Sequence, residues 1–139
     1  MQDQEAVIAA TNTYFASRAA GDFETAYDFV SEALSAQLPR SLAEERWAEE
    51  REQGVDFLAM QITNGTWYTN PEGLPPGIYA AVDFAGQSEA LPITCGYLVW
   101  HLAEDGPQLN RAEINLVAAE DFAQIPSDQR QSIAAQMGC

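Results

Sequence analysis

Lysine is absent from the 139 residues, and arginine supplies all 6 basic side chains against 21 acidic ones. The formal net charge of −15 repels the phosphates of DNA and RNA and the headgroups of an anionic membrane. Composition therefore excludes nucleic-acid binding and attachment to an acidic membrane surface. A basic protein partner or a cationic ligand stays open, and an acidic surface also serves simply to keep a protein soluble.

Long apolar runs are also lacking. None approaches the roughly 20 residues that a transmembrane helix needs, so the sequence predicts no membrane span. Residues 1–5 are polar and acidic and lack the apolar centre of a signal peptide. A cytoplasmic protein begins in this way, and so does a mature exported protein that carries a start methionine.

Cysteine and histidine are scarce. The 2 cysteines are Cys95, in an apolar stretch, and Cys139, the last residue, and neither lies in a motif typical of a metal site. The sequence predicts no metal and no cofactor. We favour a Cys95–Cys139 disulfide that ties the tail to the sheet, worth roughly 4 kcal/mol in the chain-entropy picture, which would require an oxidising compartment. Unpaired cysteines would leave a cytoplasmic location open.

Hydrophobic residues make up 47% of the chain, which is typical of a globular protein and not of a disordered one. The chain length predicts one domain over residues 1–139. Helical spacing predicts a first helix over residues 4–20, with Gly21 after its end and Asp22 as the N-cap of a second helix over residues 23–34. One face of the first helix carries Val7, Ile8, Thr11, Tyr14, Phe15 and Arg18.

A capping box at Ser41 and Glu44 predicts a third helix to about residue 53. Strand patterns follow over residues 57–62 and 66–69, with Asn64–Gly65 either as a hairpin turn or as a bulge in one long strand. Further strands are predicted over residues 78–85 and in a hairpin over 91–117 with its turn at 104–107, and a last helix over 128–137. Helices first and consecutive strands afterwards predict an α+β fold with an antiparallel sheet of about four strands.

The order of several short motifs resembles a family of short exported bacterial proteins of unknown function, within the nuclear transport factor 2-like superfamily. The motifs are a Gly-Asp-Phe…Ala-Tyr junction, a capped third helix, a Pro-x-Gly-x-Tyr loop and a closing hairpin; they use Gly21, Asp22, Phe23, Ala26, Tyr27, Ser41, Pro75, Gly77, Tyr79, Glu104, Asp105 and Gly106. The resemblance covers residues 5–117 and leaves 118–139 as an additional tail. The family's tryptophan after the hairpin turn is missing here, where Pro107 begins the next strand.

This resemblance implies a curved antiparallel sheet packed on the three N-terminal helices, with a pocket between the two layers. The short C-terminal helix lies in the additional tail and is predicted from the sequence pattern alone. It favours the periplasm or the extracellular space as the location. It implies no single activity, because the superfamily contains isomerases, dehydratases, secretion-system components and binding modules.

The strand over residues 91–102 is apolar on both faces, which predicts a central strand buried on both sides. His101 lies near its end, where a histidine can act as a general base near neutral pH. Its companions would be Asp83 from the neighbouring strand and Tyr14 or Tyr27 from the helices. A structural, hydrogen-bonded histidine is the alternative. Cys95 lacks the basic neighbour that would activate a nucleophile.

Three functions remain. The first is a non-catalytic exported domain that binds a small apolar ligand or a protein partner. The second is an isomerase or dehydratase that uses His101 and Asp83, and the third is a structural part of an envelope assembly that forms a homodimer through the sheet face. The predicted pocket is lined by Tyr14, Tyr27, Trp47, Tyr97, Trp100 and His101.

Overall fold

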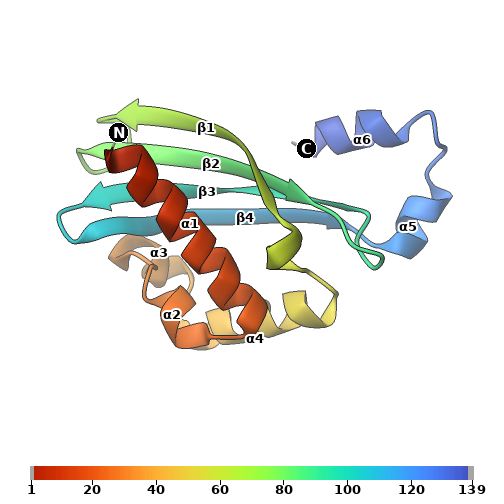
Figure 1. Ribbon diagram of the computed structural model, residues 1–139, viewed down its shortest axis with the longest axis horizontal. Helices are drawn as coiled ribbons and strands as arrows, with labels where there is room; N and C mark the ends of the chain where they lie inside the picture. The colour runs from red at the N-terminus through yellow and green to blue at the C-terminus, as the bar shows by residue number, and fades with distance from the viewer. Residues whose placement is uncertain (1, 138–139) are drawn as a thin grey trace.

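The computed structural model describes residues 2–137 and is an α+β protein with one four-stranded antiparallel sheet in the order β1-β2-β3-β4. Helices and a short 3₁₀ helix precede the sheet, and two helices follow it; Figure 1 shows α1–α4 on one side of the sheet. No helix in this part of the chain is long and apolar enough to cross a membrane. The elements are α1 (Gln2–Ala20), α2 (Phe23–Tyr27), α3 (Glu32–Gln37), α4 (Arg40–Glu52), η1 (Phe57–Ala59), β1 (Gln61–Thr69), β2 (Ile78–Gly86), β3 (Ile93–Ala103), β4 (Gly106–Val117), α5 (Ala119–Gln124) and α6 (Arg130–Gln136).

Helix α1 packs on the sheet through the face that the helical spacing predicts. Tyr14 and Phe15 are buried, whereas Ile8 from the same predicted face is exposed near the start of the helix. The Thr11 hydroxyl donates to the Val7 carbonyl at 2.8 Å and accepts a hydrogen bond from the Trp100 indole at 3.0 Å. This pair of bonds satisfies two buried polar groups and joins α1 to β3.

The prediction of one helix over residues 23–34 is wrong, because α2 and α3 are separate. Between them the backbone pairs with β4: the Leu109 N–H donates to the Phe29 carbonyl at 2.6 Å, and the Ser31 N–H donates to the Leu109 carbonyl at 2.9 Å. The Ser31 hydroxyl then accepts from the Leu34 N–H at 3.1 Å and caps α3. Tertiary pairing with the sheet edge thus replaces the local helix continuation.

The predicted capping box at the start of α4 is also wrong. The N-cap is Pro39, and no side chain caps this end of the helix. The Pro39 carbonyl accepts the Ala43 N–H at 2.9 Å, so helix geometry begins before Ser41 and places that serine inside the first turn. Proline at the boundary favours this earlier start, because its ring fixes φ near the helical value.

Residues 61–69 form one strand, with a bulge between Ile62 and Asn64, so Asn64–Gly65 is not a hairpin turn. Residues 57–59, predicted as strand, form the 3₁₀ turn η1. The hairpin of β3 and β4 is confirmed, and α5, in the tail, was not predicted. The tail helix α6 falls within its predicted range.

The two faces of β3 differ in burial. Leu98 and Trp100 face the helices and are buried, whereas Tyr97, Val99 and His101 on the other face are only partly buried. The prediction of a strand buried on both sides therefore holds only near its start, around Cys95. The four-stranded antiparallel sheet and the α+β class are confirmed.

Candidate ligand-binding site

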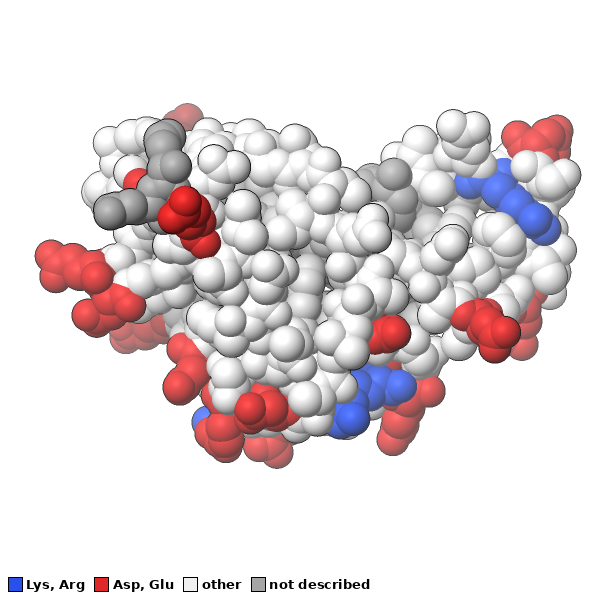
Figure 2. Space-filling view, in the orientation of Figure 1, with Lys and Arg blue, Asp and Glu red and all other residues white. Residues whose placement is uncertain are grey.

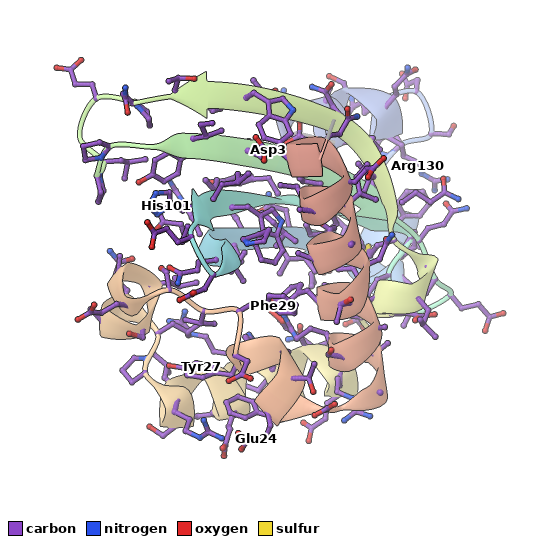
Figure 3. The ribbon with its side chains drawn as sticks, turned by 60° about the vertical axis from the view of Figure 1, so that its left-hand side comes forward. Asp3, Glu24, Tyr27, Phe29, His101 and Arg130 are labelled. Atoms are coloured by element: carbon purple, nitrogen blue, oxygen red, sulfur yellow. The ribbon has the colours of Figure 1, made fainter. Side chains whose placement is uncertain are left out.

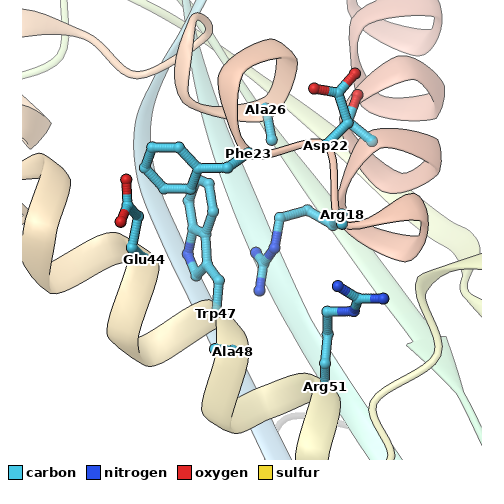
Figure 4. A pocket seen from close by; sticks show the side chains of 10 residues that line it. Arg18, Asp22, Phe23, Ala26, Glu44, Trp47, Ala48 and Arg51 are labelled. Carbon is cyan, nitrogen blue, oxygen red and sulfur yellow. The ribbon is translucent and has the colours of Figure 1, made fainter.

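A pocket of about 240 Å³ opens between the C-terminal end of α1, the short helix α2 and helix α4. We call it the arginine pocket, because two guanidinium groups line it. Figure 4 shows Arg18 and Arg51 directed into the same space, with the rings of Phe23 and Trp47 beside Arg18. The full lining is Ser17, Arg18, Gly21, Asp22, Phe23, Ala26, Glu44, Trp47, Ala48 and Arg51.

Arg18 forms the buried floor of this pocket. Only 5% of its side chain is exposed, and it forms an ion pair with Glu50 and donates to the Tyr14 hydroxyl at 2.7 Å. Its guanidinium carbon lies 4.3 Å from the Trp47 ring centroid and 4.4 Å from that of Phe57. A guanidinium tolerates such a site because it is weakly hydrated and stacks on aromatic faces. The carboxylate and the rings together fix the Arg18 guanidinium in place beneath the pocket, with its charge balanced by Glu50.

Arg51 reaches the pocket from α4 and packs over Gly21. A Cβ built on Gly21 would lie 2.2 Å from an Arg51 guanidinium nitrogen, and Gly21 has a φ of +74°. Glycine is needed at this helix end for the left-handed backbone, and the space that its missing Cβ leaves is occupied by the Arg51 guanidinium. Within residues 2–137 no carboxylate lies at ion-pair distance from Arg51. The pocket therefore presents a guanidinium that is available to an anion.

Two carboxylates also line the arginine pocket, but neither pairs with its guanidinium groups. Asp22 caps α2 and accepts hydrogen bonds from the Thr25 N–H at 3.3 Å and the Thr25 hydroxyl at 2.6 Å. Both bonds lower the pKa of Asp22, and the bond from the Thr25 hydroxyl has the larger effect. Glu44 is exposed and its carboxylate is drawn on the far side of the Phe23 and Trp47 rings from Arg51 in Figure 4.

A smaller cavity of about 90 Å³ lies between the helices and the sheet, and the exposed residues Arg46, Ala112 and Glu113 line part of it. Aromatic rings fill most of the space around it, since Tyr14 has ring centroids 6.1 Å from Trp47, 6.4 Å from Phe57 and 6.3 Å from Trp100. Burial raises the pKa of Tyr14, and the Arg18 charge beside it opposes that rise. The interior between the layers is thus mostly packed, and the larger arginine pocket lies among the helices.

The six residues predicted to line one ligand pocket lie on opposite sides of the sheet. Tyr14, Trp47 and Trp100 lie on the helix side of the sheet, and Tyr27 stacks on Phe23 at a centroid distance of 5.2 Å. Tyr97 and His101 lie on the opposite side, because consecutive residues of a strand alternate between its faces. Figure 3 shows His101 at one end of the sheet, well away from Tyr27 among the helices.

His101 packs against Tyr79 and the loop before β2. The two rings are stacked with centroids 4.4 Å apart and an interplanar angle of 6°. The Tyr79 hydroxyl donates to the Pro75 carbonyl at 2.8 Å, and a Cβ on Gly77 would lie 2.8 Å from His101 Nε2. These contacts give His101 a structural role in holding the loop.

His101 and Asp83 do not form a hydrogen-bonded pair. His101 stands opposite Tyr79 in the sheet, whereas Asp83 stands opposite Tyr97, four residues further along β2. At about 3.3 Å per strand residue the two side chains start about 13 Å apart, too far for direct proton transfer. Burial raises the pKa of Tyr97, and its contact with Glu113 raises it further.

The C-terminal tail returns to the sheet beside Cys95. The Asn115 side-chain amide donates to the Met137 carbonyl at 3.2 Å, and the Cys95 Sγ lies 3.8 Å from the same oxygen. Cys139 lies outside the described residues, so the Cys95–Cys139 disulfide stays a prediction. Among residues 2–137 no cluster of three histidine, cysteine or acidic side chains is arranged to hold a metal ion.

Sequence reasoning missed the arginine pocket. The sequence places Arg18 on the apolar face of the first helix, but it predicts no site there and gives no signal for Arg51. One signal was present: a charged residue that continues an apolar helical stripe needs a buried partner. The pairing of Arg18 with Glu50, 32 residues away, has no local signature.

Comparison of the chain with models of protein families, with curated proteins and with solved structures finds no match. The resemblance to the nuclear transport factor 2-like superfamily therefore stays a prediction.

Proposed function

We propose that this chain is a non-catalytic binding module whose arginine pocket holds a small molecule with a carboxylate and an apolar, preferably aromatic, portion. The observation that carries the proposal is the placement of two guanidinium groups and two aromatic rings around one open pocket. The carboxylate would pair with Arg51 above the buried Arg18, and the apolar portion would lie against Phe23 and Trp47. Ligand pockets commonly combine an apolar lining with a few charged groups that orient the ligand.

Size and charge narrow the class of ligand. A volume of about 240 Å³ lies below the usual range for drug-sized ligands and suits a molecule of about ten heavy atoms. Such a ligand binds in the millimolar to micromolar range. The overall charge of −15 slows the approach of any anion, so discrimination must come from the local guanidinium groups.

Titration calorimetry with 3-phenylpropanoate and with its neutral amide tests this proposal. The carboxylate should bind about tenfold more tightly, because a hydrogen bond to a charged group contributes roughly 1.5–3 kcal/mol, against about 1 kcal/mol for a neutral one. Arg51→Gln should remove that difference. Arg46→Gln is the matched control, since it removes the same charge from α4 but does not line the arginine pocket. Equal affinity for the acid and the amide, or equal loss in both variants, would overturn the proposal.

We also propose that the chain belongs to the exported family named above and works in an oxidising compartment. The position of Met137 beside Cys95 supports this, because it brings the end of the described chain to the predicted partner of Cys139. Intact-mass measurement without reductant tests it: the disulfide lowers the mass by two hydrogens, and an unchanged mass contradicts it.

A further inference from the structure

Strand β1 forms one outer edge of the sheet and pairs only with β2. Eight of its nine residues are exposed, and the remaining one, Thr66, is partly buried. An outer strand presents unpaired N–H and C=O groups along its free side, which can pair with a strand from another chain. Proteins usually protect such an edge with charged side chains, proline or a covering segment.

Charged side chains and a covering segment protect the other edge of the sheet but not β1. Strand β4 carries the exposed charges of Arg111 and Glu113, and the backbone of Phe29 and Ser31 pairs with its Leu109. By contrast, residues 57–71, which include all of β1, contain no charged residue in a chain that is 19% charged. A bulge between Ile62 and Asn64 is the one protective feature, and it leaves residues 64–69 regular.

Exposed apolar side chains gather at the same edge. Ile62 is 39% exposed, Trp67 42% and Tyr68 47%, and Ile8 of α1 is 42% exposed. Ile8, Ile62 and Trp67 line a shallow groove of about 170 Å³ between α1 and the sheet. Apolar surface beside an open strand edge is typical of an interaction site.

We propose that β1 pairs antiparallel with β1 of a second copy of this chain, so that the two sheets join into one continuous sheet across a two-fold axis. Charge selects this occupant. Two copies at −15 repel each other wherever carboxylates meet, and Figure 2 shows these along the lower rim, at the two ends and over the start of α1. The uncharged segment lets two copies approach without opposing carboxylates.

The two-fold arrangement also gives hydrogen-bond partners to the N–H and C=O groups on the free side of β1. Each copy supplies the same N–H and C=O groups, so the hydrogen bonds are reciprocal, as in other isologous interfaces. The bulge confines the pairing to residues 64–69, where Thr66 is central. Trp67 and Ile62 of each copy then lie beside the new strand pair and lose part of their exposure to water, which favours association.

Sedimentation velocity between about 1 and 100 µM, where mass action separates monomer from dimer, tests the proposal. The variant Thr66→Glu places a carboxylate at the centre of the pairing segment and should weaken the dimer at least tenfold. Thr13→Glu, on the exposed side of α1, adds the same charge away from β1 and should leave the dimer unchanged.

Circular dichroism and thermal unfolding verify that each variant folds. If Thr66→Glu does not fold, Thr69→Glu at the end of β1 replaces it. A wild-type chain that stays monomeric at the highest concentration overturns the proposal. A dimer that persists in the folded β1 variant also overturns it, and points to the open face of the sheet instead.

Discussion

Arg18 carries the main electrostatic cost of this fold. A buried guanidinium loses its hydration, and only close partners offset that loss. Here the partners are the Glu50 carboxylate, the Tyr14 hydroxyl and the Trp47 and Phe57 rings. Because Glu50 retains 21% exposure of its side chain, water shares in stabilising the pair from that side.

Removing the carboxylate should therefore destabilise the protein. We expect Glu50→Gln to lower the free energy of unfolding by about 2 kcal/mol, less than for a fully buried pair because Glu50 is partly exposed. Glu49→Gln, at an exposed neighbouring position, should change it by under about 0.5 kcal/mol. Urea unfolding measures both variants, and equal effects in the two would contradict this view of Arg18.

Tyr14 should make stability depend on alkaline pH. Its folded pKa lies above the value of about 10 that it has in the unfolded chain. Its contribution is complete below pH 10 and declines as pH rises from there through the folded pKa, because the unfolded chain then loses a proton that the folded state keeps. Tyr14→Phe should remove this part of the slope, up to about 1.4 kcal/mol per pH unit. Urea unfolding at pH 9, 10 and 11 gives the free energy of unfolding against pH for the wild type and for Tyr14→Phe. Parallel curves for the two proteins would show that Tyr14 does not cause the slope.

At the scale of elements, local patterns predicted α1, α4, α6 and the four strands, but missed α5 and η1 and the interruptions that tertiary contacts impose. The stretch over residues 23–34 reads as one helix because its spacing is helical throughout. Its break comes from backbone pairing of Phe29 and Ser31 with Leu109, a contact that local spacing does not encode. For the site, strand alternation is enough to separate Trp100 from His101. The meeting of Arg18 with Arg51 depends on how α1 and α4 pack, which local spacing does not encode.

The tail offers a test of an element held by few contacts. Asn115→Ala removes the side-chain bond to the Met137 carbonyl, so amide hydrogen exchange in α6 should rise about fivefold, as expected for a loss of roughly 1 kcal/mol. Exchange in β3 should not change. The control is Asn110→Ala, which lies on the same strand as Asn115 and removes a hydrogen bond from the Ser31 hydroxyl instead. Unaltered exchange in α6 would show that Asn115 does not hold the tail.

At the scale of the whole molecule, the charge of −15 should make stability depend on salt. Raising the salt concentration from about 20 mM to about 0.3 M shortens the screening length from about 20 Å to about 6 Å and weakens repulsion among the carboxylates. We expect the melting temperature at pH 7 to rise by several degrees, measured by scanning calorimetry. Near the isoelectric point of about 4.1 the rise should vanish. A melting temperature at pH 7 that is flat or falls with salt would contradict this.

The central claim is that the arginine pocket binds a carboxylate with an aromatic portion, and an NMR titration with 3-phenylpropanoate tests it most directly. We expect saturable shifts of the Arg51 Nε–H and Trp47 indole N–H signals, with the Trp67 indole and the Arg46 Nε–H signals unchanged. The neutral amide should shift the Trp47 signal less and the Arg51 signal hardly at all. Shifts confined to other residues, or none at millimolar ligand, would contradict the account.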